Sequence, residues 1–258
     1  MILTVCNLKG GTGKTTTAAV LAQAAVFRGK KVLAVDMDAQ ASLTYALGGS
    51  TARGNSFNLL HGMAVEKMTQ KTKQGVDLIA ANYNLSAEAS EPGSGRRLRK
   101  ALASVEKDYD LIIIDTPTMT GEAQINAMMA ADRYLIPVRA DVYGLQAIDQ
   151  ILPLIEAFRQ VDKKLQPAGV LLTEYNGRTN LADHMRELIR EKAKENGLPY
   201  LGEIRPAVAV GEAALFQESL FTRSPKSKPA QDYLALFDKL MKAQRRKHNG
   251  KQRRNEGR

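Results

Sequence analysis

The stretch Lys9-Gly10-Gly11-Thr12-Gly13-Lys14-Thr15-Thr16 lies close to the start of this 258-residue chain and decides its fold. The apolar residues 2–6 precede it and the alanine-rich residues 17–22 follow it, which predicts a strand, a glycine-rich turn and a helix. Glycines let such a turn close tightly and point its backbone N–H groups at one anion, which the positive end of the helix also attracts. The stretch therefore predicts a loop that binds the phosphates of a nucleoside triphosphate.

The side chains of this loop have separate predicted roles. The Lys14 ammonium is placed to reach the β- and γ-phosphates, and the Thr15 hydroxyl is placed to ligate Mg²⁺. The usual phosphate-loop pattern has glycine at position 8, but Leu8 stands there and a second lysine, Lys9, follows it. The plainer interpretation of Lys9 is a solvated lysine that precedes a turn. The residues predicted to contact the nucleotide are Lys9, Gly10, Gly11, Thr12, Gly13, Lys14, Thr15 and Thr16.

The composition is that of an ordinary globular domain, with 44% hydrophobic and 25% charged residues. No apolar run approaches the roughly 18 residues of a transmembrane helix, and the chain opens on a predicted strand, so neither a membrane span nor a signal peptide is expected. Cys6 is the only cysteine, which excludes a disulfide framework and predicts a reducing, cytoplasmic location.

The net charge of +10 is concentrated at the end of the chain. Residues 242–258 hold eight lysines and arginines against one acid, Glu256, and no large apolar residue follows Met241. We expect this segment to be a disordered basic tail that cannot insert into a membrane. Two interpretations stay open: weak attachment to nucleic-acid phosphates, or a solubilising end with no specific partner.

Apolar strands alternate with helical patterns along the chain. Predicted strands at 31–35, 76–80, 111–114, 133–138, 170–173 and 200–204 are interspersed with helices at 96–106, 145–158, 181–195 and 228–243. This order predicts an α/β fold: a doubly wound, mostly parallel sheet with helices on both faces. No internal repeat and no second domain are visible.

Acidic residues follow two of these strands. Asp36 and Asp38 follow the second strand, and Asp115 ends the run Leu111-Ile112-Ile113-Ile114. Open parallel sheets bind their ligands at the carboxyl ends of the strands, so these acids are predicted to lie beside the phosphate loop. We expect Thr15, Asp36 and Asp115 to hold Mg²⁺, and Asp38 to orient or activate the attacking water. The plainer alternative is that each aspartate caps a strand end.

Several motifs together resemble the ParA/Soj-type partition ATPases, which belong to the ParA/MinD family and carry a deviant Walker A loop with two lysines. Asp36-Met37-Asp38-Ala39-Gln40 is similar to the first switch of that family, with Ala39 in place of the usual proline. Asp115-Thr116-Pro117 is similar to the second switch, and residues 171–179 resemble a late strand and loop. Residues 1–241 are accordingly identified as one ParA-like ATPase domain.

The resemblance implies a P-loop ATP hydrolase with slow intrinsic turnover that uses ATP and Mg²⁺. In that family the front lysine, here Lys9, reaches the nucleotide of a partner subunit, so Lys9, Lys14 and Asp38 are the expected catalytic set. Arg205 and Pro206 border the adenine in relatives and are assigned to the nucleotide, although their order is reversed from the usual Pro-Arg.

The resemblance also implies partners: a homodimer when ATP is bound, non-specific DNA, and a ParB-like centromere-binding protein that stimulates hydrolysis. The protein is thus expected on the nucleoid and not at a membrane. Glu187, Glu191 and Glu195 interleave with the basic residues of their helix, so a solvated salt-bridged face is the plainer interpretation there. The residues predicted to bind DNA are Arg186, Arg190, Arg223, Lys226 and Lys228, with Lys192 and Lys194 as further candidates.

The sequence leaves two other functions open. One is a positioning ATPase of the same family that moves a different cargo, such as a conjugation or surface complex. The other is a phosphate-loop ligase that makes a metabolite, against which Lys9 and the basic tail argue.

Overall fold

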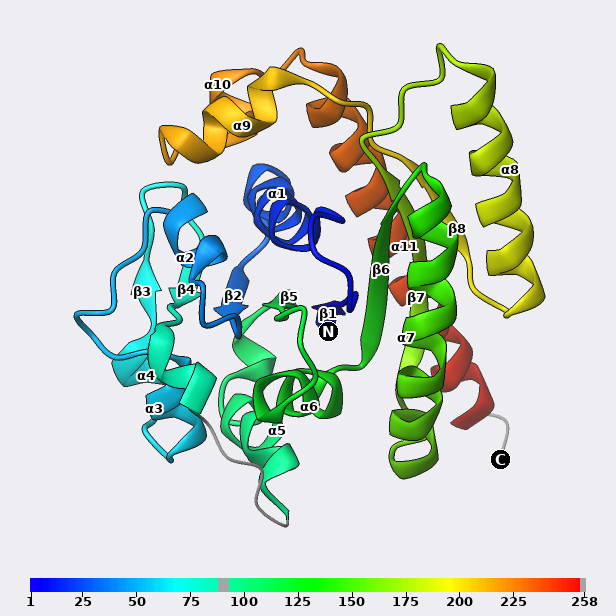
Figure 1. Ribbon diagram of the computed structural model, residues 1–258. Helices are drawn as coiled ribbons and strands as arrows, with labels where there is room; N and C mark the ends of the chain where they lie inside the picture. Colours follow the sequence, from blue (N-terminus) through cyan, green and yellow to red (C-terminus); the bar gives the residue numbers. More distant parts are fainter. Residues whose placement is uncertain (88–92, 256–258) are drawn as a thin grey trace.

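The strands form one continuous sheet in the computed structural model, which describes residues 1–87 and 93–255 (Figure 1). The order across this eight-stranded sheet is β3-β4-β2-β5-β1-β6-β7-β8, and only β3 pairs antiparallel, with β4. The doubly wound, mostly parallel fold is therefore confirmed. The strands are β1 (Ile2–Val5), β2 (Val32–Asp36), β3 (Gln70–Lys71), β4 (Asp77–Ile79), β5 (Leu111–Asp115), β6 (Arg133–Arg139), β7 (Gln166–Thr173) and β8 (Tyr200–Glu203).

Helices cover both faces of the sheet (Figure 1). One face carries α1 (Lys14–Phe27), α2 (Ser42–Ala46), α9 (Val208–Leu215), α10 (Leu220–Arg223) and α11 (Lys228–Asn255). The other face carries α3 (Ser56–Leu60), α4 (Val65–Met68), α5 (Arg97–Leu102), α6 (Glu122–Ala130), α7 (Val142–Val161) and α8 (Asn180–Glu195). Short 3₁₀ turns lie at η1 (Tyr83–Ala87), η2 (Ser94–Arg96) and η3 (Glu106–Asp108).

The central strands β1, β2 and β5 are apolar at nearly every position because both of their sides are buried; Thr4, Asp36 and Asp115 are their polar residues. In β1, Leu3 and Val5 pack beneath α1, whereas Ile2 packs on the opposite side, and all three are fully buried. Alternate residues thus serve two separate cores, so a continuous apolar run is needed and no polar face remains. This arrangement holds β1, β2 and β5 side by side, with their carboxyl ends at one edge.

Helices α7 and α11 extend beyond their predicted bounds. Helix α7 covers residues 142–161 where 145–158 was predicted, and it includes Pro153, because a proline removes one N–H but packing against the sheet holds the other turns. Helix α11 extends to Asn255, so residues 242–255 continue a helix where a disordered tail was predicted. Extending an existing helix is much less costly than starting one, and lysine, arginine and glutamine are good helix formers. Residues 256–258 of the predicted tail lie outside the described residues.

No helix within the described part of the chain combines the length and the apolar character needed to cross a bilayer.

Candidate functional site

The glycine-rich loop joins β1 to α1 in the middle of the sheet, and its backbone takes the conformation that glycine allows. Gly11 has φ +71° and Gly13 has φ +84°, both in the left-handed region. Gly13 caps the start of α1, and a Cβ built there would lie 3.4 Å from the Thr173 methyl group. The turn therefore keeps its concave side open to an anion at the helix start.

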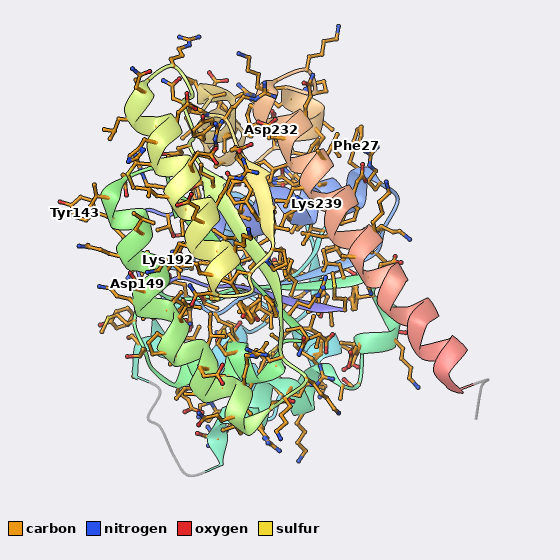
Figure 2. All side chains as sticks on the ribbon, turned by 90° about the vertical axis from the view of Figure 1, so that its right-hand side faces the viewer. Phe27, Tyr143, Asp149, Lys192, Asp232 and Lys239 are labelled. Carbon is orange, nitrogen blue, oxygen red and sulfur yellow. The ribbon has the colours of Figure 1, made fainter. Side chains whose placement is uncertain are left out.

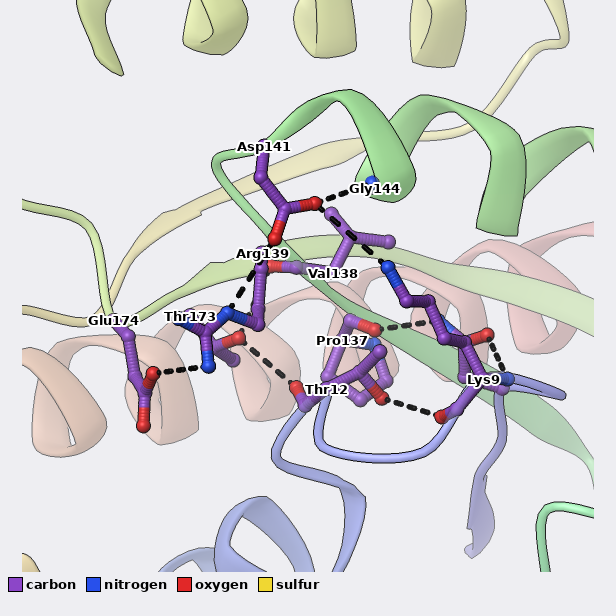
Figure 3. A network of polar contacts seen from close by, with 10 residues as sticks. Lys9, Thr12, Pro137, Val138, Arg139, Asp141, Gly144, Thr173 and Glu174 are labelled. Carbon is purple, nitrogen blue, oxygen red and sulfur yellow. Dashed lines mark hydrogen bonds and ion pairs between the residues drawn. The ribbon is translucent and has the colours of Figure 1, made fainter.

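Polar side chains from neighbouring strands hold the loop in place (Figure 3). Asn7 donates from Nδ2 to the Pro137 carbonyl oxygen at 2.8 Å, and its Oδ1 accepts from the Lys9 N–H at 3.0 Å. The Thr173 hydroxyl lies 2.9 Å from the Thr12 carbonyl oxygen and 3.0 Å from that of Val138, and donates to one of them. Asn7 and Thr173 were not among the predicted site residues. Only the pairing of β6 with β7 brings Thr173 to the loop, whereas Asn7 lies two residues before Lys9 and its contact with the Lys9 N–H is local.

Lys14 is almost entirely enclosed, with only 6% of its surface exposed. Its Nζ donates to the Lys9 carbonyl oxygen at 3.2 Å. Burial lowers the pKa of Lys14, and the nearby Asp115 and Asp38 carboxylates partly oppose that shift. An enclosed ammonium with so few partners is suited to a multiply charged anion, as the predicted contact with the phosphates requires.

The Lys9 side chain contacts residues of its own chain that lie at the start of α7 (Figure 3). Its Nζ lies 3.9 Å from Asp141 Oδ1 and 4.0 Å from the centre of the Tyr143 ring. Asp141 also pairs with Arg139, which in turn contacts Glu174 at 2.8 Å. The predicted contact of Lys9 with a partner subunit is untested in this single chain.

Asp36 and Asp115 lie side by side at the carboxyl ends of β2 and β5, where they are register partners. Both are fully buried. Burial and the neighbouring Asp36 charge raise the pKa of Asp115 well above its ordinary value, and the Thr15 hydroxyl on the same side partly offsets the rise. Neither Asp115 oxygen completes a hydrogen bond with any residue that the structure describes. A buried carboxylate without a partner is costly unless a cation neutralises it.

These groups fit the donor set of Mg²⁺. The described residues hold no group of three or more His, Cys, Asp or Glu side chains that would enclose a metal ion by themselves. Mg²⁺ is usually bound through one or two protein oxygens, with phosphate and water oxygens completing its shell. The Asp115 carboxylate and the Thr15 hydroxyl match that requirement beside the phosphate loop.

Asp36 and Asp38 differ from Asp115 in their partners. Asp36 accepts hydrogen bonds from the Asp38 N–H and from both the N–H and the hydroxyl of Thr44. Burial raises the pKa of Asp36 to about 6, against the lowering effect of the Thr44 and Asp38 donors. Asp38 is half-buried and caps its own turn, because its Oδ1 accepts from the Gln40 N–H at 3.0 Å. The structure thus brings Lys14, Asp36, Asp38 and Asp115 into one cluster, as predicted from the strand ends.

Arg205 and Pro206 directly follow β8, and Arg205 is held by an acid of α11. The Arg205 guanidinium forms a bidentate pair with Asp232 of α11, at 3.0 and 2.6 Å, and its backbone N–H donates to the same carboxylate. Pro206 is exposed. The next residue of α11, Tyr233, has its hydroxyl 3.3 Å from that of Thr17 in α1. The assignment of Arg205 and Pro206 to the nucleotide stays a prediction.

The predicted DNA-binding residues fall into two groups. On α8, Arg186 and Arg190 contact Glu187, and Lys192 pairs with Asp149 of α7 at 2.5 Å (Figure 2). Arg223 is likewise engaged, with Glu218 at 2.8 Å. Lys226 and Lys228 are exposed and have no ion pair or hydrogen bond within the part of the chain that the structure describes. Lys194 of α8 is likewise exposed, and its side chain has no ion pair among the described residues, so these three lysines are the candidates whose charge is least compensated.

Comparison with known proteins shows what the chain is similar to. Residues 1–167 match the family described as AAA domain. The chain is 33% identical over 241 residues to the chromosome-partitioning ATPase Soj of Thermus thermophilus, covering 93% of this chain and 94% of that one. It is 31% identical over 250 residues to the chromosome partitioning protein ParA of Myxococcus xanthus, covering 93% and 88%. The crystal structure of cobyrinic acid a,c-diamide synthase from Mycobacterium smegmatis, with bound ATP analogue and magnesium, matches with a TM-score of 0.78 at 28% identity over 95% of both chains.

Proposed function

This chain belongs to the ParA/MinD family of partition ATPases, and on that premise we propose that it is an ATP-driven DNA-segregation switch. The protein is an ATP hydrolase that uses ATP and Mg²⁺. ATP joins two copies, the dimer binds duplex DNA on the nucleoid without reading its sequence, and a ParB-like centromere-binding partner stimulates hydrolysis. The observation that carries the proposal is the two-lysine loop beside a buried carboxylate that has no hydrogen-bond partner among the described residues, in a chain similar to Soj and ParA over nine-tenths of its length.

The roles of the site residues follow from their charge and burial. Lys14 and the backbone N–H groups of residues 11–16 neutralise the phosphate oxygens, because phosphoryl transfer needs charge balance more than covalent help. Thr15 and Asp115 hold Mg²⁺, which supplies further positive charge at the phosphates when bound. Asp38 orients or activates the attacking water, and Asp36 lies beside it in the outer part of the metal site.

Lys9 is proposed to leave its present contacts when two copies meet. An exposed ion pair is worth about 0–1 kcal/mol and an exposed cation–π contact about 0.5–1 kcal/mol. Its contacts with Asp141 and Tyr143 are of these kinds, since the Lys9 and Asp141 side chains are 31% and 37% exposed. The phosphates of a partner's nucleotide carry more charge and can displace them, which makes the dimer depend on ATP.

The first prediction concerns Lys9. Lys9→Ala should keep nucleotide binding, because Lys14 and the loop backbone remain, but lose ATP-dependent dimerisation. Light scattering of the protein with a non-hydrolysable ATP analogue measures the dimer, and fluorescent-nucleotide titration measures binding. Asp141→Ala is the matched control, since it frees Lys9 from its present partner without removing the ammonium. A Lys9→Ala protein that dimerises normally would contradict the proposed role.

The second prediction tests the function as a whole. Gel retardation of duplex DNA of arbitrary sequence, at low salt, should show a shift with ATP and little or none with ADP. Binding through phosphates alone weakens steeply as salt rises, so the shift should disappear at high salt. Absent or nucleotide-independent binding would overturn the proposal.

Two other activities are compatible with the site. A positioning ATPase for another cargo would share the site, and it is favoured if DNA binding fails while the ATP-dependent dimer persists. A metabolite-making ligase is the other alternative, because the matching Mycobacterium smegmatis structure is a synthase by name. ATP-dependent DNA binding separates the proposed function from that ligase.

A further inference from the structure

Hydrogen bonds between Asp36 and Thr44 join the two ends of the segment 37–43, which contains Asp38. Asp36 Oδ2 accepts from the Thr44 N–H at 2.8 Å and from the Thr44 hydroxyl at 2.8 Å. Its Oδ1 accepts from the Asp38 N–H at 3.1 Å. One carboxylate thus connects the end of β2, the middle of the segment and the first turn of α2.

The Thr44 hydroxyl both donates and accepts a hydrogen bond. It donates to Asp36 and accepts from the Ala81 N–H at 2.9 Å, just after β4, and Thr44 is only 6% exposed. The main chain of Asp36 is anchored as well, because the Ser56 hydroxyl donates to its carbonyl oxygen at 2.5 Å. Asp36 therefore has little freedom to rotate toward another ligand.

The two buried aspartates consequently differ in what they offer a cation. Asp36 accepts three hydrogen bonds from the protein, whereas neither oxygen of Asp115 completes one within the described residues. A carboxylate that already receives several donors is the weaker competitor for a metal ion. Asp115 is therefore the better ligand for the cation, and Asp36, in the outer part of the metal site, also organises the segment 37–43.

The segment needs such an anchor. Ala41 has φ +54°, a left-handed conformation that costs free energy in a residue with a Cβ and persists only where surrounding contacts impose it. The contacts are local: the Ala41 N–H donates to the Asp38 carbonyl oxygen at 2.8 Å, and the Gln40 N–H donates to the Asp38 carboxylate at 3.0 Å. Asp38 is therefore placed by a turn that Asp36 and Thr44 hold at its two ends.

We propose that Thr44 is a positioning residue of the ATPase site, acting through Asp36 to fix Asp38. This inference rests on the proposed role of Asp38 in orienting the attacking water. The Thr44 hydroxyl would then matter for turnover far more than for nucleotide binding, because the phosphates are bound by residues of another segment.

Three variants test the proposal. Thr44→Val keeps the shape but removes the hydroxyl, Thr44→Ser keeps the hydroxyl, and Thr44→Ala is a second hydroxyl-free form. Thr72→Val is the matched control. Thr72 is similarly buried, at 7%, and its hydroxyl also accepts from a backbone N–H, that of Val76 in the β3–β4 connection.

We expect Thr44→Val to lower kcat by about tenfold to a hundredfold, as a small displacement of a catalytic group does. The affinity for fluorescent Mg–ADP should stay within about threefold of the unaltered protein, since binding and turnover depend on different contacts. Thr44→Ser should restore turnover, and Thr72→Val should leave it unchanged. Amide hydrogen exchange of residues 37–43 should speed up in Thr44→Val and not in Thr72→Val.

Three outcomes would overturn the proposal: normal turnover in Thr44→Val, an equal loss of turnover and nucleotide affinity, or failure of both hydroxyl-free variants to fold while Thr72→Val folds. These measurements need no DNA, so the segregation function can fail without affecting them. Asp38→Asn tests the assumed role of Asp38 separately from the role of Thr44. If it keeps full turnover, the assumed role of Asp38 is wrong, whereas the exchange measurement still reports whether Thr44 anchors the segment.

Discussion

At the scale of single residues, the site consists of charges that the fold keeps out of water. Lys14 is 6% exposed, and Asp115 is fully buried without a hydrogen-bond partner among the described residues. Such groups destabilise the free protein, because a buried charge is costly until an opposite charge compensates it. The site therefore favours a bound nucleotide and cation, and the nucleotide-free protein is less stable for it.

The third prediction concerns this buried acid. The pKa of Asp115 is raised in the folded protein by burial and by Asp36, so the folded chain binds the proton more tightly than the unfolded chain does. The stability contributed by this group is then present at low pH and is lost as the pH rises through the folded pKa. Asp36 acts in the same direction, between its ordinary pKa of 3.8 and about 6.

Asp115→Asn should therefore raise the Tm of the nucleotide-free protein at neutral pH, by about 2–8 °C for a gain of one to two kcal/mol. The gain should shrink toward pH 4, where the carboxyl of the unaltered protein is protonated. Thermal unfolding between pH 4 and 8, without Mg²⁺ or nucleotide, measures this. The variant should also lose the extra stability that Mg–ATP confers. A lower Tm at neutral pH would contradict the argument.

At the scale of elements, the first turn of α7 presents Asp141 and Tyr143 to Lys9. Asp141 caps this helix, since its Oδ1 accepts from the Gly144 N–H at 2.8 Å. The turn approaches β6 so closely that a Cβ at Gly144 would lie 2.1 Å from the Arg139 carbonyl oxygen. Glycine at 144 is thus required by close approach of two backbones.

The fourth prediction uses this glycine and a matched one. Gly144→Ala should destabilise the protein by roughly 2 kcal/mol or more, because the backbone of β6 or α7 must shift. Gly211→Ala, in α9, meets no atom within 4 Å and should stabilise by about 0.5–1 kcal/mol through helix propensity. Urea unfolding of both variants checks the pair. Equal effects of the two substitutions would show that the close approach is not needed.

At the scale of the whole molecule, positive charge is distributed unevenly over the described elements. Arg186, Arg190 and Lys192 of α8 are engaged with acids on α7 and α8, as Figure 2 shows for Lys192 and Asp149. Lys194 of the same helix is exposed and its side chain has no such partner among the described residues. Lys226 and Lys228, at the start of α11, lack such partners within the described chain. Because compensated charges attract phosphates less, DNA should contact the α11 start, with two uncompensated lysines, more than α8, with one.

The fifth prediction follows from that difference. Lys226→Ala combined with Lys228→Ala should weaken ATP-dependent DNA binding and make its salt dependence shallower by about two released counterions. Arg190→Ala is the control, because its guanidinium already contacts Glu187. Turnover without DNA should be unchanged in both variants. Titrations at several salt concentrations measure the slope, and a larger effect from Arg190→Ala would place the DNA on α8 instead.

Much of the fold was predictable because its signals are local. The phosphate loop, the apolar runs and the acids at strand ends are read from short stretches, and one register of β2 with β5 suffices to bring Asp36 beside Asp115. The short β3 was missed, since a two-residue strand carries no periodicity. The length of α11 was missed because a polar, basic composition is shared by helices and disordered tails.

The sequence by itself determined the fold class, the phosphate loop and the set of charged residues at the sheet edge, because periodicity and glycine placement act over neighbouring residues. Only the tertiary structure decided which partner each charge has. Thr44 with Asp36, Lys9 with Asp141, and Arg205 with Asp232 are separated by 8 to 132 positions, and the last two pairs join a loop to a helix that is distant in the sequence. Such contacts depend on strand register and helix packing, which sum many weak interactions that no short stretch encodes.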